Sequence, residues 1–414
     1  MIKYHKTILE NGLTVIIHQD STSPIAAINL LYNVGARDEN EQRTGFAHLF
    51  EHLMFGGSSN IPDYDTHVET AGGQNNAFTS NDITNYYITI PKENLETALW
   101  LESDRMLSLA FTPKSLEVQR QVVIEEFKQN YLNQPYGDAY LLLRDLAFKV
   151  HPYKWATIGK EIDHIEKATM EEVKEFFFTH YAPNNAILCI AGDIEEEETL
   201  EMVNKWFGSI PKREVPSRNL PKEPIQSEER ILHVERDVPV NMIYKVFHVC
   251  DRRHSDFFVV DVLSDILSRG RSSRFHEILM RQQQIFTEID AYVGGELDPG
   301  LFYIIGKLAD GFTMEQGDEA IWKVLNQIKE EKIQERELNK LKNKFEAAHL
   351  YQQASVLDKA MELCYSELLG DANFINDDLV KYQQSTTEGV QAMANTIFTK
   401  ENSSTLFYHA KTEA

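Results

Sequence analysis

Cysteine is scarce in this chain. Three cysteines occur, Cys189, Cys250 and Cys364, far apart and odd in number. They form neither a disulfide framework nor the Cys-x-x-Cys spacing of a cysteine zinc site. The sequence also lacks a run of about eighteen apolar residues and an apolar segment behind its N-terminus, so we expect neither a membrane-spanning helix nor a secretory leader. These absences predict a cytoplasmic protein without a membrane partner.

Positive charge is in deficit. Lys and Arg together number 41 against 64 Asp and Glu, a formal net charge of −23. Nucleic acid and anionic membrane attract basic surfaces, so this balance argues against both as partners. A glycine-rich phosphate loop and a serine or cysteine nucleophile elbow are also missing. A negative field favours basic substrates, although an acidic balance often serves solubility alone.

The length and the order of expected elements predict two similar domains. A chain of 414 residues with 42% hydrophobic and 25% charged residues is a globular protein too long for one ordinary core. Both halves begin with strands, pass through helices, return to a hairpin and end in helices, the last being long helices over 334–369 and 376–398. We therefore predict an α+β fold of two homologous domains, each an antiparallel-rich β-sheet packed against helices. Prolines among charged residues mark 213–228 as a linker between an N-terminal domain at 1–212 and a C-terminal domain at 229–414.

One stretch carries recognisable chemistry. His48 and His52 are four residues apart and project from the same side of one helix, with Glu51 beside them. Two such imidazoles can bind one zinc ion, and the neighbouring carboxylate can take a proton from water at the metal. The order His-x-x-Glu-His is the inverzincin signature. An amphipathic helix without a metal is the other interpretation, its core face formed by Phe46, Leu49, Phe50 and Leu53.

Zinc usually has three protein ligands, and the best candidates for the third lie in Gln119-Arg120-Gln121-Val122-Val123-Ile124-Glu125-Glu126. His-x-x-Glu-His followed by a glutamate 74 residues after His52, inside a Val-Val-x-x-Glu helix, resembles the pitrilysin/insulinase family of zinc metallopeptidases. Aligning the two valines places the family's ligand at Glu126 rather than Glu125. The alternative is that both glutamates are solvated helix carboxylates.

The resemblance covers nearly the full length and fits the branch with about 400 residues per subunit, which includes mitochondrial processing peptidases. It implies zinc bound by His48, His52 and Glu126, with Glu51 as general base. It also implies an edge strand that pairs with the peptide substrate by β-augmentation, at Asn76, Ala77 and Phe78.

The chain departs from the family pattern in two places. The family usually has a glutamate seven residues before the glutamate ligand, where this chain has Gln119, which cannot carry a proton or a charge. Active single-chain members also have an Arg and a Tyr, seven residues apart in the C-terminal half, that hold substrate and oxyanion. An ungapped alignment puts Met280 and Thr287 at those places.

From these features we expect a zinc metalloendopeptidase subunit. A homologous partner subunit is expected to supply the Arg/Tyr pair in a heterodimer, with a homodimer left open. The alternative is a catalytically inactive, core-protein-like subunit of a larger complex. The intact zinc motif favours the enzyme, whereas the missing Arg/Tyr pair indicates dependence on a partner.

Overall fold

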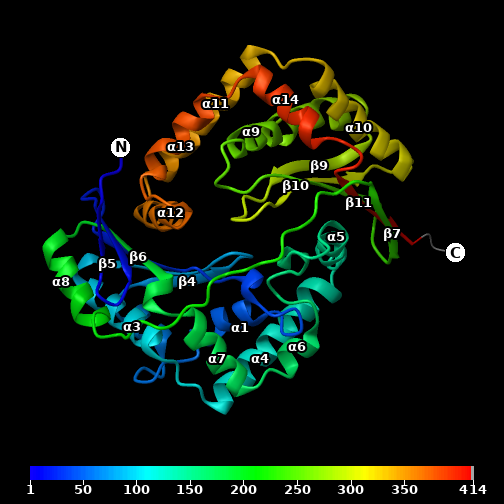
Figure 1. The fold of residues 1–414 in the computed structure, drawn as a ribbon. Coiled ribbons are helices and arrows are strands. Elements are labelled where there is room, and N and C mark those ends of the chain that lie inside the picture. Colours follow the sequence, from blue (N-terminus) through cyan, green and yellow to red (C-terminus); the bar gives the residue numbers. More distant parts are fainter. Residues whose placement is uncertain (412–414) are drawn as a thin grey trace. The chain divides into compact units, whose positions relative to one another are not determined.

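The computed structural model describes residues 1–411, which form two compact units (Figure 1). Unit 1 comprises Met1–Lys128, Trp155–Leu220 and His349–Asp377, and unit 2 comprises Gln129–Lys154, Pro221–Ala348 and the chain from Asp378 onward. Each unit contains one β-sheet packed against helices, so the predicted α+β fold is confirmed. In the described residues, no helix combines the length and apolar character that crossing a membrane requires.

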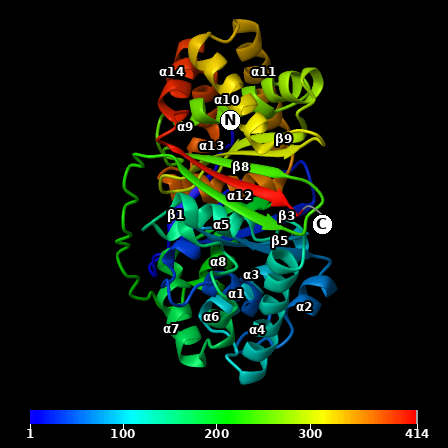
Figure 2. The same ribbon diagram turned by 90° about the vertical axis from the view of Figure 1, so that its right-hand side faces the viewer.

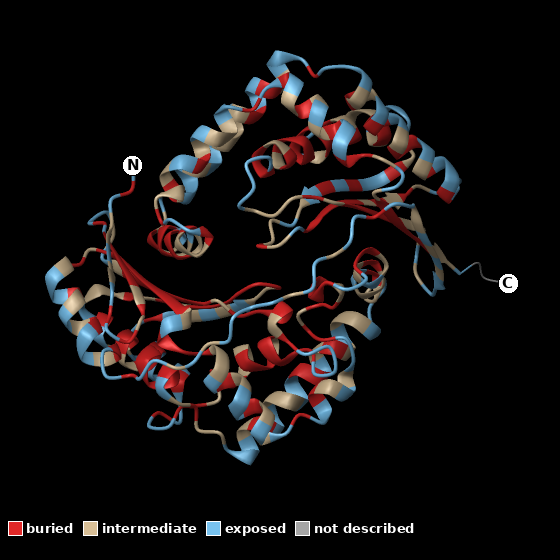
Figure 3. Cartoon of the chain, in the orientation of Figure 1, coloured by how far each residue is buried: buried red, intermediate tan, exposed pale blue. Residues whose placement is uncertain are grey.

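The sheet of unit 1 has six strands in the order β1-β2-β6-β3-β5-β4. Strands β2 and β6 are parallel and every other neighbouring pair is antiparallel. The central strand β6 is buried along its whole length, as the red colour in Figure 3 shows. The strands are β1 (His5–Ile8), β2 (Thr14–Gln19), β3 (Ile25–Tyr32), β4 (Gln74–Thr79), β5 (Thr84–Pro91) and β6 (Ala186–Gly192).

Most helices of unit 1 come from the first half of the chain. They are α1 (Phe46–Leu53), α2 (Tyr64–Thr70), α3 (Leu95–Leu107), α4 (Pro113–Phe127), α6 (Ile162–Glu166), α7 (Met170–His180), α8 (Glu196–Phe207) and, from the second half, α12 (Val356–Leu369). Threonine or aspartate caps start several of them. Thr112, for example, accepts the Ser115 N–H in front of Pro113, a residue suited to a first helical turn.

Unit 2 has five strands in the order β7-β11-β8-β10-β9. They are β7 (Arg230–Arg236), β8 (Met242–His248), β9 (Phe286–Val293), β10 (Leu301–Leu308) and β11 (Ser403–Ala410). Its helices include α5 (Ala139–Ala147), α9 (Phe257–Ser268), α10 (Met314–Glu330) and α14 (Thr387–Ile397). The division between the units falls inside α11 (Glu335–Gln352) and α13 (Phe374–Gln383). A π-helix over Phe275–Gln282 precedes β9, and another over Lys128–Leu132 continues α4.

The two sheets repeat one topology. β7-β11-β8-β10-β9 matches β2-β6-β3-β5-β4 in order and in direction, since β7 and β11 are parallel and the remaining neighbours are antiparallel. The ladders also start at equivalent pairs, Tyr32 with Ala186 in unit 1 and Phe247 with Ser403 in unit 2. This shared topology agrees with the duplication that the order of elements predicts.

Each sheet is covered on one face by a helix from the opposite half of the sequence. Helix α12 packs on β3 and β6 of unit 1, and α5 packs on β11, β8 and β7 of unit 2. The compact units therefore differ from the contiguous ranges 1–212 and 229–414. Residues 129–154 join unit 2, and residues 349–377 join unit 1. The intervening stretch 213–228 has no helix or strand.

The long helices predicted over 334–369 and 376–398 are each interrupted, so that part of the prediction is wrong. Ser355 accepts the Asp358 N–H and starts α12, and Thr386 accepts the Gly389 N–H and starts α14. A side chain that caps a new helix ends the preceding one at the same time. The first of these breaks leaves α12 free to pack on the sheet of unit 1.

Candidate metal centre

Helix α1 carries both histidines and begins in a tightly constrained way. Gly45 precedes it with φ of 89°, a left-handed conformation in which a Cβ atom would also lie 2.7 Å from the Ile158 carbonyl oxygen. The buried carboxyl of Glu39 accepts the N–H groups of Gly45 and Ala47 at 2.9 and 2.8 Å. These contacts fix where the helix begins.

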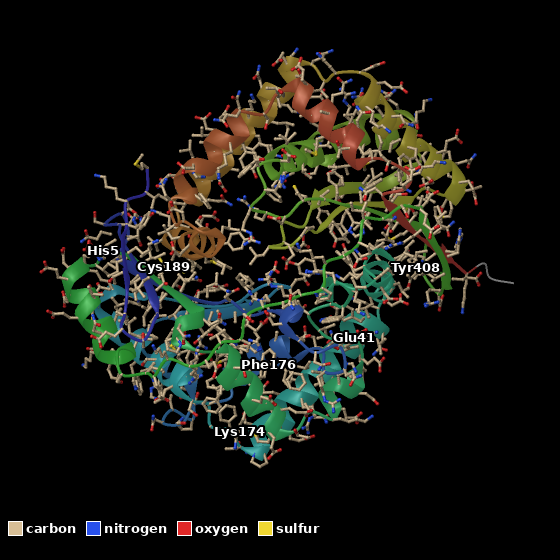
Figure 4. The ribbon with its side chains drawn as sticks, viewed as in Figure 1. His5, Glu41, Lys174, Phe176, Cys189 and Tyr408 are labelled. Carbon is tan, nitrogen blue, oxygen red and sulfur yellow. The ribbon has the colours of Figure 1, made fainter. Side chains whose placement is uncertain are left out.

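The apolar side of α1 packs against aromatic side chains. Phe50 stacks on Phe176 and Tyr181 with ring centroids 5.2 and 5.1 Å apart. Phe176, labelled in Figure 4, comes from α7. With the Phe46, Leu49, Phe50 and Leu53 side buried, His48 and His52 are presented on the other side of the helix, toward α4.

Three predicted ligands converge. The Nε2 atoms of His48 and His52 lie 3.6 and 3.4 Å from the same Oε2 atom of Glu126, and the two imidazole centroids are 4.8 Å apart. Glu126 reaches them because α4 runs beside α1, as Figures 1 and 2 show. Among residues 1–411, these three form the one group of histidine, cysteine or carboxylate side chains close enough together to hold a metal ion. The neighbouring Glu125 points elsewhere, with its carboxylate 68% exposed and paired with Lys128 at 2.7 Å.

The surroundings favour the protonation states that bind a metal. Burial lowers the pKa of His48, against the opposing charge of Glu126, so its imidazole is neutral near pH 7. The His52 imidazole beside Glu126 lowers the pKa of that carboxyl, which keeps it ionised. A neutral imidazole and an ionised carboxylate are the forms that ligate zinc.

The geometry fits zinc. Two ligand atoms at about 2.0–2.1 Å from a tetrahedral ion lie about 3.3–3.4 Å apart, close to the observed 3.4 and 3.6 Å. Those separations exceed the 2.7–3.2 Å usual for N–H···O hydrogen bonds. Two histidines and one glutamate also form a donor set of catalytic zinc sites, which leave a fourth position open. The three side chains remain 13%, 25% and 35% exposed, so solvent reaches the group.

The proposed base and the predicted substrate strand lie in the same unit. Glu51 is half-buried on α1, and its charge acts on His48. Asn76, Ala77 and Phe78 lie on β4, the outermost strand of the sheet, which packs beside α1. Among the described residues β4 pairs with β5 alone, which leaves its other edge open to an extended peptide. Their substrate-binding role stays a prediction.

The structure also shows the surroundings of the residues that depart from the family pattern. Gln119 lies on α4, where its amide nitrogen approaches Gly56, just beyond α1. Met280 packs against the core of unit 2, and exposed Thr287 donates to the Lys307 carbonyl at 3.3 Å. Arg281 is 71% exposed and pairs with Glu277 at 2.9 Å.

Sequence reasoning missed several side chains that support α1. Besides Glu39, Tyr86 donates its hydroxyl to the Phe50 carbonyl at 3.3 Å, and the Arg105 guanidinium lies over the Tyr86 ring at 4.4 Å. Glu102 pairs with Arg105 in the same buried region. Burial raises the pKa of Glu39 to about 8, although two backbone N–H groups favour its charged form. Glu39 lies six residues before Gly45, and neither its type nor that spacing identifies it from sequence as a support of α1.

Comparison with known proteins gives one consistent family. Residues 14–152 match the family model described as insulinase (peptidase family M16), and residues 167–345 match the one described as peptidase M16 inactive domain. The chain is 29% identical to the zinc protease PqqE of Helicobacter pylori over 98% of this chain and 92% of that protein. The crystal structure of a protease from Helicobacter pylori superposes with a TM-score of 0.94 at 28% identity, covering 99% of this chain and 100% of that one.

Two eukaryotic relatives match about half of the chain. The mitochondrial-processing peptidase subunit beta of Saccharomyces cerevisiae is 28% identical over 50% of this chain and 45% of that protein. Subunit 1 of the human mitochondrial cytochrome b-c1 complex is 28% identical over 50% of this chain and 42% of that protein. By name, one relative is a subunit of a peptidase and the other a subunit of the cytochrome b-c1 complex.

Proposed function

Because this chain belongs to the pitrilysin/insulinase family (M16), we propose that it is a zinc metalloendopeptidase subunit that hydrolyses peptides. The observation that carries this proposal is the convergence of His48 and His52 on one oxygen of Glu126, at separations that a tetrahedral zinc ion spans. These three side chains are the proposed ligands.

When bound, zinc supplies Lewis acidity that polarises the peptide carbonyl and makes water a stronger acid. Glu51 is the proposed general base. Its carboxylate, held on the same helix as both histidines, accepts a proton from the attacking water and returns it to the leaving amine. The open edge of β4 at Asn76, Ala77 and Phe78 orients the peptide by main-chain hydrogen bonds, which predicts tolerance of many sequences.

A homologous partner subunit is part of the proposal. Met280 packs against the core of unit 2 and Thr287 donates to a carbonyl group, so neither provides the cationic and phenolic groups that the family uses at those places. A partner carrying the Arg/Tyr pair would complete the site. A neighbouring gene for a chain of similar length with that pair, but without the zinc motif, would support this arrangement.

The decisive experiment compares wild type with Glu51→Gln, each with and without the partner. We expect equal zinc content by mass spectrometry and cleavage of quenched fluorescent peptides reduced by roughly 10²–10⁴-fold in the variant. Undiminished cleavage by Glu51→Gln would rule out Glu51 as the base.

The second candidate is a structural subunit without peptidase activity. The similarity to cytochrome b-c1 complex subunit 1 and the family model described as an inactive domain favour it. Zinc-loaded protein that cleaves no peptide with any homologous partner would establish this alternative.

A further inference from the structure

Unit 1 has a helix that unit 2 lacks among the described residues. Helix α8 follows β6 and packs on α3 and β2 (Figure 1). Its buried face consists of Thr199, Val203 and Phe207, spaced four residues apart. In unit 2 the strand equivalent to β6 is β11, and no helix follows it within residues 1–411. The surface equivalent to the seat of α8 is formed by α10 and β7, and among the described residues no helix covers it: Ile231 of β7 is 50% exposed.

A pocket adjoins this surface, lined by residues of α10, of β11 beside β7, and of the segment before β11. It has a volume of about 640 Å³, within the roughly 300–1,000 Å³ of ligand pockets. Three aromatic side chains, Trp322, Phe398 and Phe407, line it. Phe398 and Phe407 are 0% and 8% exposed, whereas Trp322 is half-buried, so Trp322 is the aromatic side chain that the pocket offers to a bound helix.

One acidic residue of the pocket has an equivalent in unit 1. In unit 1, Glu96 is the second residue of α3 and accepts from Lys205 Nζ at 2.5 Å and from Trp206 Nε1 at 3.1 Å, which ties down the end of α8. Glu315 is the second residue of α10, is exposed and lines the pocket. Its position therefore matches that of the carboxylate that pairs with a lysine of α8.

Further acidic residues surround the aromatic walls. The pocket is lined by the carboxylates Glu315, Asp318, Glu319 and Glu401 and by the amines of Lys329 and Lys400. Lys329 donates to the Phe398 carbonyl at 3.0 Å, so its charge is partly engaged. Acidic residues near a helix N-terminus stabilise the helix by themselves, which explains their presence on α10 but not the aromatic pocket beside them.

The base of this surface is polar, in contrast to unit 1. Lys245 of β8 occupies the position that Leu30 has in β3. In the ladders Lys245 pairs with Thr405 of β11, and Leu30 pairs with Leu188 at the equivalent position of β6. Leu30 is fully buried in an apolar layer, whereas Lys245, also fully buried, pairs with the pocket residue Asp318 at 3.0 Å and lies 4.9 Å from the Trp322 ring. Lys245 and Asp318 therefore neutralise each other within unit 2. Because this buried ion pair does not need a partner from a covering helix, such a helix can bind reversibly.

We propose that this surface binds an amphipathic helix of another polypeptide in the manner in which α3 and β2 hold α8. The bound helix presents a lysine or arginine to Glu315 and a large apolar side chain to Trp322. This helix-docking site is independent of the metal centre.

The test measures binding of a fluorescein-labelled peptide with the sequence of residues 195–210 and four changes, Glu196→Ala, Glu197→Ala, Glu198→Ala and Glu201→Lys. These changes remove acidic charge and keep the buried face, Lys205 and Trp206. Fluorescence anisotropy with the full chain is expected to give a dissociation constant in the micromolar range. Glu315→Lys is expected to weaken binding by about fivefold or more.

The matched control is Glu330→Lys, the same charge change at an exposed position of α10 outside the pocket lining. It is expected to bind the peptide like wild type, with both variants keeping the wild-type unfolding temperature. A peptide carrying Lys205→Glu and Phe207→Ala should not bind. Absent binding, or equal weakening by Glu315→Lys and Glu330→Lys, would overturn the proposal. The full chain could also self-associate, with Glu315→Lys abolishing the association and Glu330→Lys preserving it. That result would assign the surface to a second copy of this chain and would also overturn the proposal.

Discussion

At the scale of single residues, Glu125 and Glu126 are adjacent in sequence and differ completely in surroundings. One carboxylate is mostly exposed and pairs with Lys128, while the other faces two imidazoles. A helix turns by about 100° per residue, so neighbours point in different directions. The pair provides a variant and its control within one helical turn.

We predict that Glu126→Gln lowers zinc affinity while Glu125→Gln leaves it unchanged. The loss should exceed the roughly 10–100-fold typical of residues that only support a ligand, because a neutral amide replaces a direct anionic ligand. Competition with a chromophoric chelator measures both affinities. Equal affinity for the two variants would remove Glu126 from the ligand set.

The metal ligands could be predicted from the sequence, whereas the residues that position them could not. His48, His52 and Glu126 have diagnostic types and spacing, and the structure brings them together. Glu39 and Arg105 have no such signal, because ordinary charged residues become buried supports of α1 only through tertiary packing. Their roles depend on which elements meet, which local pattern does not encode.

At the scale of elements, α12 is held to unit 1 by apolar packing and by one buried ion pair. Its residues Val356, Ala360 and Leu363 join a core that includes Leu31 and Ile187. Lys359 on the same helix donates to Asp20 just after β2, and both residues are 8% exposed. Burial opposes ionisation of Asp20, but hydrogen bonds from Lys359 and Thr22 outweigh it and lower the pKa of Asp20 to about 2.

This ion pair predicts a specific loss of stability in acid. The folded pKa of Asp20, about 2, lies below its ordinary value of 3.8, so its contribution is complete above about pH 5 and disappears as the pH falls toward 2. The contribution is about 2 kcal/mol. Asp20→Asn should therefore lower the unfolding free energy at pH 7 and flatten its decline between pH 4 and 2, as measured by urea titration.

The control for that measurement is Asp163→Asn, which removes an exposed partner of Lys167. Exposed pairs contribute little, so this variant should follow the wild-type pH dependence. An equally steep acid decline in Asp20→Asn would contradict the assignment.

At the scale of the whole molecule, the exchanged helices make each half of the sequence incomplete. Residues 1–212 contain the metal centre and the whole six-stranded sheet but lack α12, which covers β3 and β6. We predict that residues 1–212 expressed alone bind a hydrophobic dye and unfold without cooperativity. Supplying residues 349–377 through a flexible linker should restore a cooperative transition. Cooperative unfolding of 1–212 alone would refute this dependence.

The duplication was predictable from the order of elements, but the exchange was not. The periodicity of 334–369 is helical on both sides of Ser355, so sequence pattern does not reveal that the second part packs on a distant sheet. Only the complementarity of apolar faces decides which sheet a helix covers. The location in the cell, the partner subunit and the substrate strand stay predictions.

The late position of α12 in the sequence also delays completion of unit 1 during translation. The last strand of the first sheet ends at Gly192, and the helix that seals that sheet ends at Leu369, about 180 residues later. At roughly 5–20 residues per second, a ribosome needs about 10–35 s to cover that distance. During this interval the nascent chain exposes a bare apolar sheet, which makes it a client for molecular chaperones before it is ever a folded subunit.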